Sequence, residues 1–126
     1  MRVKTVLVID DDSGFRKSLT GVLKQSGYQA LEAANGREAL ERLREMPKPR
    51  VVVVDWSMPE MDGLDFIRTV RAQPAYEDVP ILMATTETDL SYVARALEAG
   101  ANEYVMKPFS KRMIRDQLAL LGVDPD

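Results

Sequence analysis

The 126-residue sequence contains no histidine and no cysteine. Without cysteine there can be no disulfide, no thiolate nucleophile and no zinc–thiolate site. Without histidine there can be no Ser-His dyad, no imidazole general base and no phosphohistidine within the chain. Any chemistry must therefore use carboxylates, hydroxyls, amines and a hard metal ion. The absence of cysteine also agrees with a reducing compartment, so we expect a cytoplasmic protein.

Long apolar runs and an excess of positive charge are missing as well. No run approaches the roughly 18 apolar residues of a membrane span, and the N-terminus lacks the apolar segment of a signal peptide. The 20 acidic and 17 basic residues give a formal net charge of −3. Nucleic acids and anionic membranes attract basic surfaces, so we expect neither as a partner. At about 100–200 residues per domain, residues 1–126 are expected to form a single domain.

Apolar runs of strand length alternate five times with segments of helical periodicity. Four successive valines at 51–54 put apolar groups on both faces of their strand, which is typical of a central parallel strand with cover on both sides. This alternation predicts an α/β fold, a doubly wound, five-stranded parallel sheet with right-handed crossovers. The predicted strands are 5–10, 28–33, 50–56, 80–85 and 103–107, and the predicted helices follow them at 12–25, 35–46, 62–73, 90–99 and 110–121.

The helix boundaries carry recognisable end signals. Either Asp12 or Ser13 can cap the first helix, and Gly27 suits the left-handed position after its end. The other predicted caps are Asn35, which has a glutamate three residues later, Asp62 and Ser110. In the helix over 90–99, the apolar stripe predicted to face the core consists of Leu90, Val93, Ala94 and Leu97.

Polar residues gather where four of the five strands end. Three acids, Asp10, Asp11 and Asp12, follow the first strand; Asp55, Thr85 and Lys107 follow the third, fourth and fifth. The second strand ends in Ala33 and Ala34, which offer no chemistry. Ligands of open α/β sheets bind beyond the carboxyl ends of the strands. The distribution therefore predicts a site built by strands 1, 3, 4 and 5, with strand order 2-1-3-4-5.

The residue types at this edge indicate a metal and a phosphoryl group. Converging carboxylates repel one another unless a cation compensates them, and oxygen ligands alone favour Mg²⁺ or Mn²⁺. Lys107 and Thr85 would then be partners for an anion, and one carboxylate could be the nucleophile that forms an aspartyl phosphate. Taken singly, each residue has a plainer explanation as a turn, a helix cap or a surface charge. Their joint placement at one end of one sheet favours a site.

The motifs resemble those of the CheY-like receiver domains of bacterial response regulators, which have a flavodoxin-like (βα)5 fold. The similarity lies in VLVIDDD from Val6, VVVVDWSMPEMDG at 51–63, ILMATT at 81–86 and EYVMKPF at 103–109, and extends over essentially the whole chain. The resemblance implies a stand-alone receiver domain without an output domain, and a role in two-component signal transduction.

Roles for individual residues follow from this resemblance. Asp55 is similar to the phospho-acceptor, which takes a phosphoryl group from a sensor histidine kinase or from a small donor such as acetyl phosphate. Asp10 and Asp11, with Asp55 and the backbone carbonyl of Ser57, would hold Mg²⁺. Lys107 would pair with the phosphoryl oxygens. A protein that turns over only its own phosphoryl group is not an enzyme in the usual sense.

The resemblance also implies a conformational switch. Thr85 is similar to the hydroxyl that moves to bond the phosphoryl group, and Tyr104 to the aromatic residue that swings inward behind it. The change would appear on the face formed by the fourth helix, the fifth strand and the fifth helix, where a downstream protein binds. A flagellar motor switch protein is one such partner, in chemotaxis, and other phosphorelays are alternatives. Ser57, Thr86 and Glu87 occupy positions that vary in the family and leave the lifetime of the phosphorylated state open.

Two other functions remain open at this point. Asp10 and Asp12 after an apolar strand also resemble the nucleophile motif of haloacid-dehalogenase-type phosphatases. The short chain, the lack of a substrate-capping segment and the unexplained motif around Asp55 count against that alternative. The second is a receiver-like binding module that is never phosphorylated.

Overall fold

A parallel sheet of five strands forms the centre of the computed structural model, which describes residues 4–56, 58, 60–86, 90–107 and 109–122. The order β2-β1-β3-β4-β5 confirms the predicted topology. β2 and β4 end where predicted, whereas β1, β3 and β5 end one or two residues earlier, so Asp10, Asp55 and Lys107 lie just beyond the sheet and Thr85 is the last residue of its strand. The strands are β1 (Lys4–Ile9), β2 (Tyr28–Ala33), β3 (Val51–Val54), β4 (Ile81–Thr85) and β5 (Glu103–Met106).

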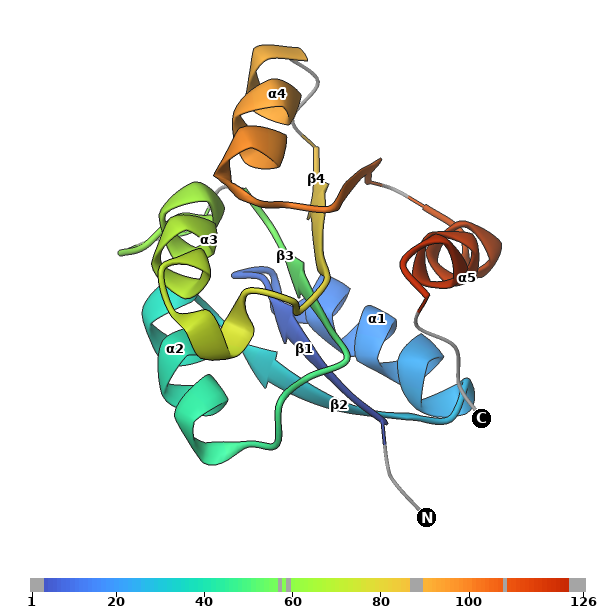
Figure 1. The fold of residues 1–126 in the computed structure, drawn as a ribbon. Helices are drawn as coiled ribbons and strands as arrows, with labels where there is room; N and C mark the ends of the chain where they lie inside the picture. The colour runs from blue at the N-terminus through green and yellow to red at the C-terminus, as the bar shows by residue number, and fades with distance from the viewer. Residues whose placement is uncertain (1–3, 57, 59, 87–89, 108, 123–126) are drawn as a thin grey trace.

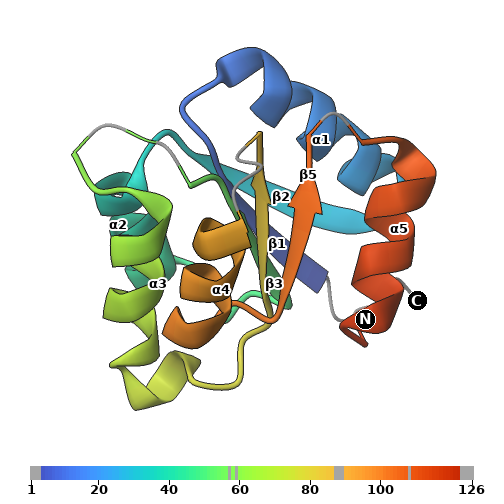
Figure 2. The same cartoon turned by 90° about the horizontal axis from the view of Figure 1, so that it is seen from above.

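Helices cover both faces of the sheet, as the valine run predicts. In Figures 1 and 2, α1 and α5 lie on one side of the strands, and α2, α3 and α4 lie on the other. A short 3₁₀ helix, η1 (Pro74–Tyr76), follows α3 and was not predicted. Among the described residues, no helix has the length and apolar character needed to cross a membrane. The helices are α1 (Ser13–Gln25), α2 (Gly36–Glu45), α3 (Gly63–Arg71), α4 (Leu90–Ala99) and α5 (Lys111–Leu120).

Alternation along the strands produces two separate cores, because successive side chains of a strand point to opposite faces. In β3, Val52 and Val54 pack with residues of α2, α3 and α4, whereas Val51 and Val53 pack with residues of α1 and α5. All four valines are buried. The central strands are thus fixed from both sides, and their carboxyl ends form a rigid edge on which a site can be built.

The helix ends agree with the predicted signals. Asp12, rather than Ser13, caps α1, because its Oδ1 accepts the backbone N–H of Phe15 at 3.2 Å. The side chain of Asn35 accepts the N–H three residues on at 2.8 Å, and Asp62 and Ser110 cap α3 and α5 in the same way. Gly27 has a φ of 96°, the left-handed conformation predicted for it.

The predicted buried side of α4 is wrong. Leu97 is 46% exposed and Ala94 is also exposed, whereas Ala96, outside the predicted stripe, is fully buried. The helix packs against α3, and the side chain of Tyr92 joins the core on that side. A short helix with apolar residues on several sides allows more than one rotation about its axis, and here tertiary packing selects the side that carries Ala96.

Candidate functional site

Three carboxylates meet at the carboxyl ends of β1 and β3. The backbone N–H of Asp55 donates to the carbonyl of Ile9 at 3.0 Å, which places it beside Asp10 and Asp11. One carboxylate oxygen from each of the three acids lies within 4.8 Å of the other two. Asp10 and Asp55 are only 1% and 8% exposed, whereas Asp11 faces solvent. A compact set of oxygen ligands with one open side fits a hard divalent cation such as Mg²⁺.

Lys107 supplies a positive charge to the same cluster. Its Nζ lies 2.5 Å from Oδ2 of Asp10 and 3.7 Å from Oδ2 of Asp55. Its ammonium group also sits 3.9 Å from the centroid of the Phe15 ring, and its backbone N–H donates to the carbonyl of Thr85 at 2.9 Å. The other oxygen of Asp10 accepts the N–H of Asp12 at 2.9 Å. Both oxygens of Asp10 thus have partners, while Lys107 stays within reach of Asp55.

The environment of Asp55 disfavours its negative charge. Burial is the main cause that raises the pKa of this carboxyl above its ordinary value, and the neighbouring Asp10 raises it further. The ammonium of Lys107 opposes this shift, as do hydrogen bonds from the Thr85 hydroxyl and from the backbone at Trp56. Because these groups do not cancel the cost of burial, the site would gain stability from an added cation.

A close backbone contact holds the segment that carries Asp55. The N–H of Gly63, the first residue of α3, donates to the carbonyl of Trp56 at 2.9 Å. A Cβ atom at residue 63 would stand only 2.2 Å from the carbonyl oxygen of Asp55. Only glycine fits here, so the start of α3 packs directly against the backbone of Asp55.

An aromatic and cationic stack connects the site to α4. The ring of Trp56 meets that of Tyr92 edge to face, with centroids 4.8 Å apart. The guanidinium carbon of Arg95 lies 5.7 Å from the indole centroid and 5.8 Å from the Tyr92 ring. Tyr104 of β5 is partly buried against the same core. The residue after Asp55 is therefore in direct contact with α4.

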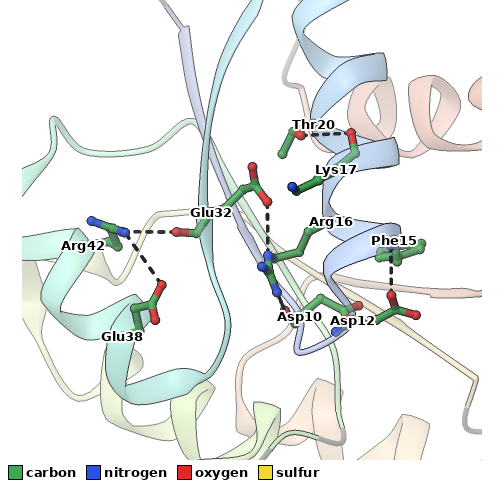
Figure 3. Close-up of polar contacts among 9 residues, drawn as sticks. All are labelled: Asp10, Asp12, Phe15, Arg16, Lys17, Thr20, Glu32, Glu38 and Arg42. Carbon is green, nitrogen blue, oxygen red and sulfur yellow. Dashed lines mark hydrogen bonds and ion pairs between the residues drawn. The ribbon is translucent and has the colours of Figure 1, made fainter.

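A second set of contacts lies behind the acidic loop and was missed by sequence reasoning (Figure 3). Arg16 of α1 donates through an NH1 proton to the backbone carbonyl of Asp10 at 2.6 Å and through Nε to Glu32 of β2 at 3.1 Å. Arg16 and Glu32 are sixteen positions apart on different elements, so no local spacing could have paired them. The second strand, for which no role at the site was predicted, thus contributes through Glu32.

The structure brings together five of the predicted site residues: Asp10, Asp11, Asp55, Thr85 and Lys107. Tyr104 lies on β5, the strand that leads to Lys107, and its side chain is partly buried. Ser57, whose backbone carbonyl is a predicted metal ligand, lies outside the described residues, as does Glu87.

Known proteins share both the sequence pattern and the fold. The family model of the response regulator receiver domain matches residues 6–119. The chain belongs to this family. Chemotaxis protein CheY1 of Helicobacter pylori is similar to this receiver, with 40% identity over 117 residues that cover 92% of this chain and 94% of that protein. A CheY homolog of Campylobacter jejuni is 41% identical over 114 residues, or 90% of this chain and 88% of that protein.

A solved structure shows the same fold. Vibrio cholerae chemotaxis protein CheY4 superimposes on the receiver with a TM-score of 0.90 at 33% identity, covering 95% of this chain and 99% of that one. The predicted fold class and the predicted family are both confirmed. Membership of this family makes the chain a component of two-component signalling, and its relatives connect it with chemotaxis-type regulators.

Proposed function

We propose that this receiver is a phosphorylation switch in which Asp55 accepts a phosphoryl group from the phosphohistidine of a sensor histidine kinase. The observation that carries the proposal is the meeting of three carboxylates, Lys107 and the Thr85 hydroxyl at one edge of the sheet. Residues 1–126 contain no histidine, so the donor imidazole lies outside this sequence. A small acyl phosphate could serve as donor in its place.

The transfer forms one bond and breaks another. A carboxylate oxygen of Asp55 attacks phosphorus, the P–O bond forms, the P–N bond of the donor breaks, and the imidazole keeps the electron pair. Lys107, 3.7 Å from Asp55, pairs with the phosphoryl oxygens, and the Thr85 hydroxyl, which bonds Asp55 here, donates to one of them. Mg²⁺, or Mn²⁺, held by Asp10, Asp11, Asp55 and the carbonyl of Ser57, would neutralise the charge that develops on the phosphoryl group.

The phosphoryl group adds roughly −1.5 to −2 charges and three strong acceptors at one point, which biases nearby groups toward a new arrangement. We propose that Thr85 and Tyr104 carry this change to the face made by α4, β5 and α5. These elements lie next to one another in Figure 2. Leu97 of α4 and Met113 of α5 are exposed there and offer apolar area to a partner.

The proposal also covers the downstream partner, the cellular location and the domain organisation of the protein. The chemotaxis names of the relatives support a flagellar motor switch protein as the downstream partner. A kinase donor and such a partner would both place the protein in the cytoplasm. The expectation that no output domain accompanies the receiver stays a prediction.

Phosphorylation by acetyl phosphate tests the proposal. The purified protein is incubated with acetyl phosphate and Mg²⁺, and intact mass and peptide mapping report which aspartate carries the phosphoryl group. We expect one phosphoryl group on Asp55, its loss in Asp55→Asn, and its loss when Mg²⁺ is chelated. Asp12→Asn is the matched control, because Asp12 is an exposed acid of the same loop that caps α1 and lies outside the carboxylate cluster.

Two results would contradict the proposal. A phosphoryl group on Asp10 that survives Asp55→Asn would indicate the phosphatase-type chemistry instead. No phosphorylation at all, combined with no change in the fluorescence of Trp56 on adding Mg²⁺ and beryllofluoride, would indicate an unphosphorylated binding module. Trp56 is the single tryptophan and adjoins Asp55, so the tryptophan emission comes from a residue beside this site.

A further inference from the structure

The side chain of Arg16 joins two strand ends behind the acidic loop (Figure 3). One NH1 proton is donated to the backbone carbonyl of Asp10 at 2.6 Å, and Nε donates to the carboxylate of Glu32 at 3.1 Å. The Arg16 side chain is only 16% exposed. A guanidinium has a planar, fixed arrangement of donors, so a contact at each end holds it in one orientation.

The carbonyl that Arg16 binds belongs to the peptide that connects Asp10 to Asp11. Because a peptide unit is planar, fixing the direction of its carbonyl also fixes where the next Cα lies. Asp10 has further anchors in Lys107 and the N–H of Asp12. Asp11 is exposed and lies outside the helices and strands, so the position of its backbone limits where its carboxylate can reach. Arg16 therefore bears most directly on Asp11.

Glu32 makes this contact specific to arginine. The carboxylate of Glu32 orients Nε and balances the charge of the guanidinium, which leaves NH1 directed at the Asp10 carbonyl. Arg42 of α2 lies on the other side of Glu32: its Nε donates to the Glu32 carbonyl at 3.2 Å and its NH2 lies 3.7 Å from Glu38. Arg42 is thus in the same group of charges without touching the Asp10 carbonyl.

We infer that Arg16 is a positioning residue for the metal site, which it serves by fixing the peptide between the two acidic ligands. The inference rests on the proposed function, since it concerns the Mg²⁺ that the phosphoryl transfer uses. Groups that orient metal ligands from behind typically change metal affinity 10- to 100-fold when they are removed. No sequence motif or family role assigned above identifies this residue.

Charge and geometry make opposite predictions for this residue. Arg16 is a cation close to a cation site, so by charge alone its removal would strengthen Mg²⁺ binding. If it positions Asp11, its removal weakens binding despite the more favourable charge. Arg42→Gln removes the same charge from the same group of side chains and is therefore a matched control.

The experiment measures the Kd for Mg²⁺ of the full chain by isothermal titration calorimetry, with Trp56 fluorescence as a second readout. We expect a Kd about 10-fold higher or more for Arg16→Gln and one within about twofold of wild type for Arg42→Gln. Arg16→Lys keeps the charge but has no planar pair of donors to bridge Glu32 and the Asp10 carbonyl. Its Kd is expected to rise as well. Urea unfolding checks that each variant is folded. If Arg16→Gln does not fold, the Kd of Arg16→Lys tests the inference in its place.

The outcomes separate this inference from the proposed function. If wild type binds Mg²⁺ and is phosphorylated, but the Arg16 variants bind Mg²⁺ equally well or more tightly, the positioning role is wrong and the proposed function stands. If Arg42→Gln weakens binding as much as Arg16→Gln, the effect belongs to the whole charged group and the inference is also wrong. If wild type does not bind Mg²⁺, both proposals are overturned.

Discussion

Replacing Gly63 by alanine should disturb the site without touching any of its functional groups. A Cβ at this position would stand 2.2 Å from the carbonyl oxygen of Asp55, 3.0 Å from its carbonyl carbon and 3.1 Å from the Cα of Trp56. All three neighbours are backbone atoms, so no flexible side chain can turn away. Either the start of α3 or the segment carrying Asp55 has to move.

The size of the effect follows from these distances. Close contacts between carbon and a carbonyl oxygen lie near about 3.3 Å, so relief requires a shift of about 1 Å. Overpacking of this kind typically costs about 1–3 kcal/mol of unfolding free energy. A misplacement of about 1 Å in a reacting group can lower a rate about 100-fold. We therefore expect Gly63→Ala to be less stable and to accept phosphoryl groups at Asp55 far more slowly.

Two measurements on the same variant test this expectation. Urea unfolding gives the loss of stability, and the rate of phosphorylation by acetyl phosphate with Mg²⁺, followed by intact mass, gives the loss of reactivity. Gly21→Ala is the matched control. Gly21 lies inside α1, and a Cβ there would meet nothing within 4 Å. Alanine is the better helix former, so this variant should gain roughly 0.5–1 kcal/mol and keep its phosphorylation rate.

The reasoning would be refuted if Gly63→Ala were as stable as wild type and were phosphorylated at the same rate. A loss of stability with an unchanged rate would show that α3 moves and the segment carrying Asp55 does not. In that case the proposed support of Asp55 by α3 would be wrong.

Two further predictions concern buried charge. Because burial raises the pKa of Asp55 in the folded state, the folded protein loses stability as pH rises from about 4. In urea unfolding with EDTA present, Asp55→Asn should therefore be more stable than wild type at pH 7 and similar to it at pH 4. The guanidinium of Arg71 donates to the carbonyls of Gly100 and Tyr76. Arg71→Met should therefore lower the unfolding free energy by about 2–3 kcal/mol in the same assay, whereas Arg68→Met, at an exposed position, should change it by no more than about 0.5 kcal/mol. A pH-independent Asp55→Asn effect, or equal losses at the two arginines, would contradict these expectations.

Much of the fold could be predicted because its signals are local. The valines of β3 require cover on two faces whatever the rest of the chain does, and the caps at Asp12 and Asn35 act within three residues of their own position. The site residues were predictable for a related reason. In a parallel sheet all carboxyl ends share one edge, so knowing that Asp10 and Asp55 end two strands is enough to bring them together.

The rotation of a helix about its axis is not a local property. The spacing of apolar residues in α4 predicted that Leu97 is part of the core. Packing against α3 buries Ala96 instead and leaves Leu97 exposed to solvent. The free energy of either rotation depends on which side chains the neighbouring helix presents. That information resides in α3 and in Trp56, which lie outside α4 and earlier in the chain.

By itself, the sequence determined the order of the strands, the two-sided core and the identity of the acids, the hydroxyl and the lysine at the edge of the sheet. Only the tertiary structure decided how those groups are supported: Arg16 reaching from α1 to the Asp10 carbonyl, and Gly63 pressed against the backbone of Asp55. The physical reason is the separation along the chain between the residues that interact. Periodicity and capping act between residues a few positions apart, whereas support is a matter of a few ångströms between atoms that the chain brings together only when it folds.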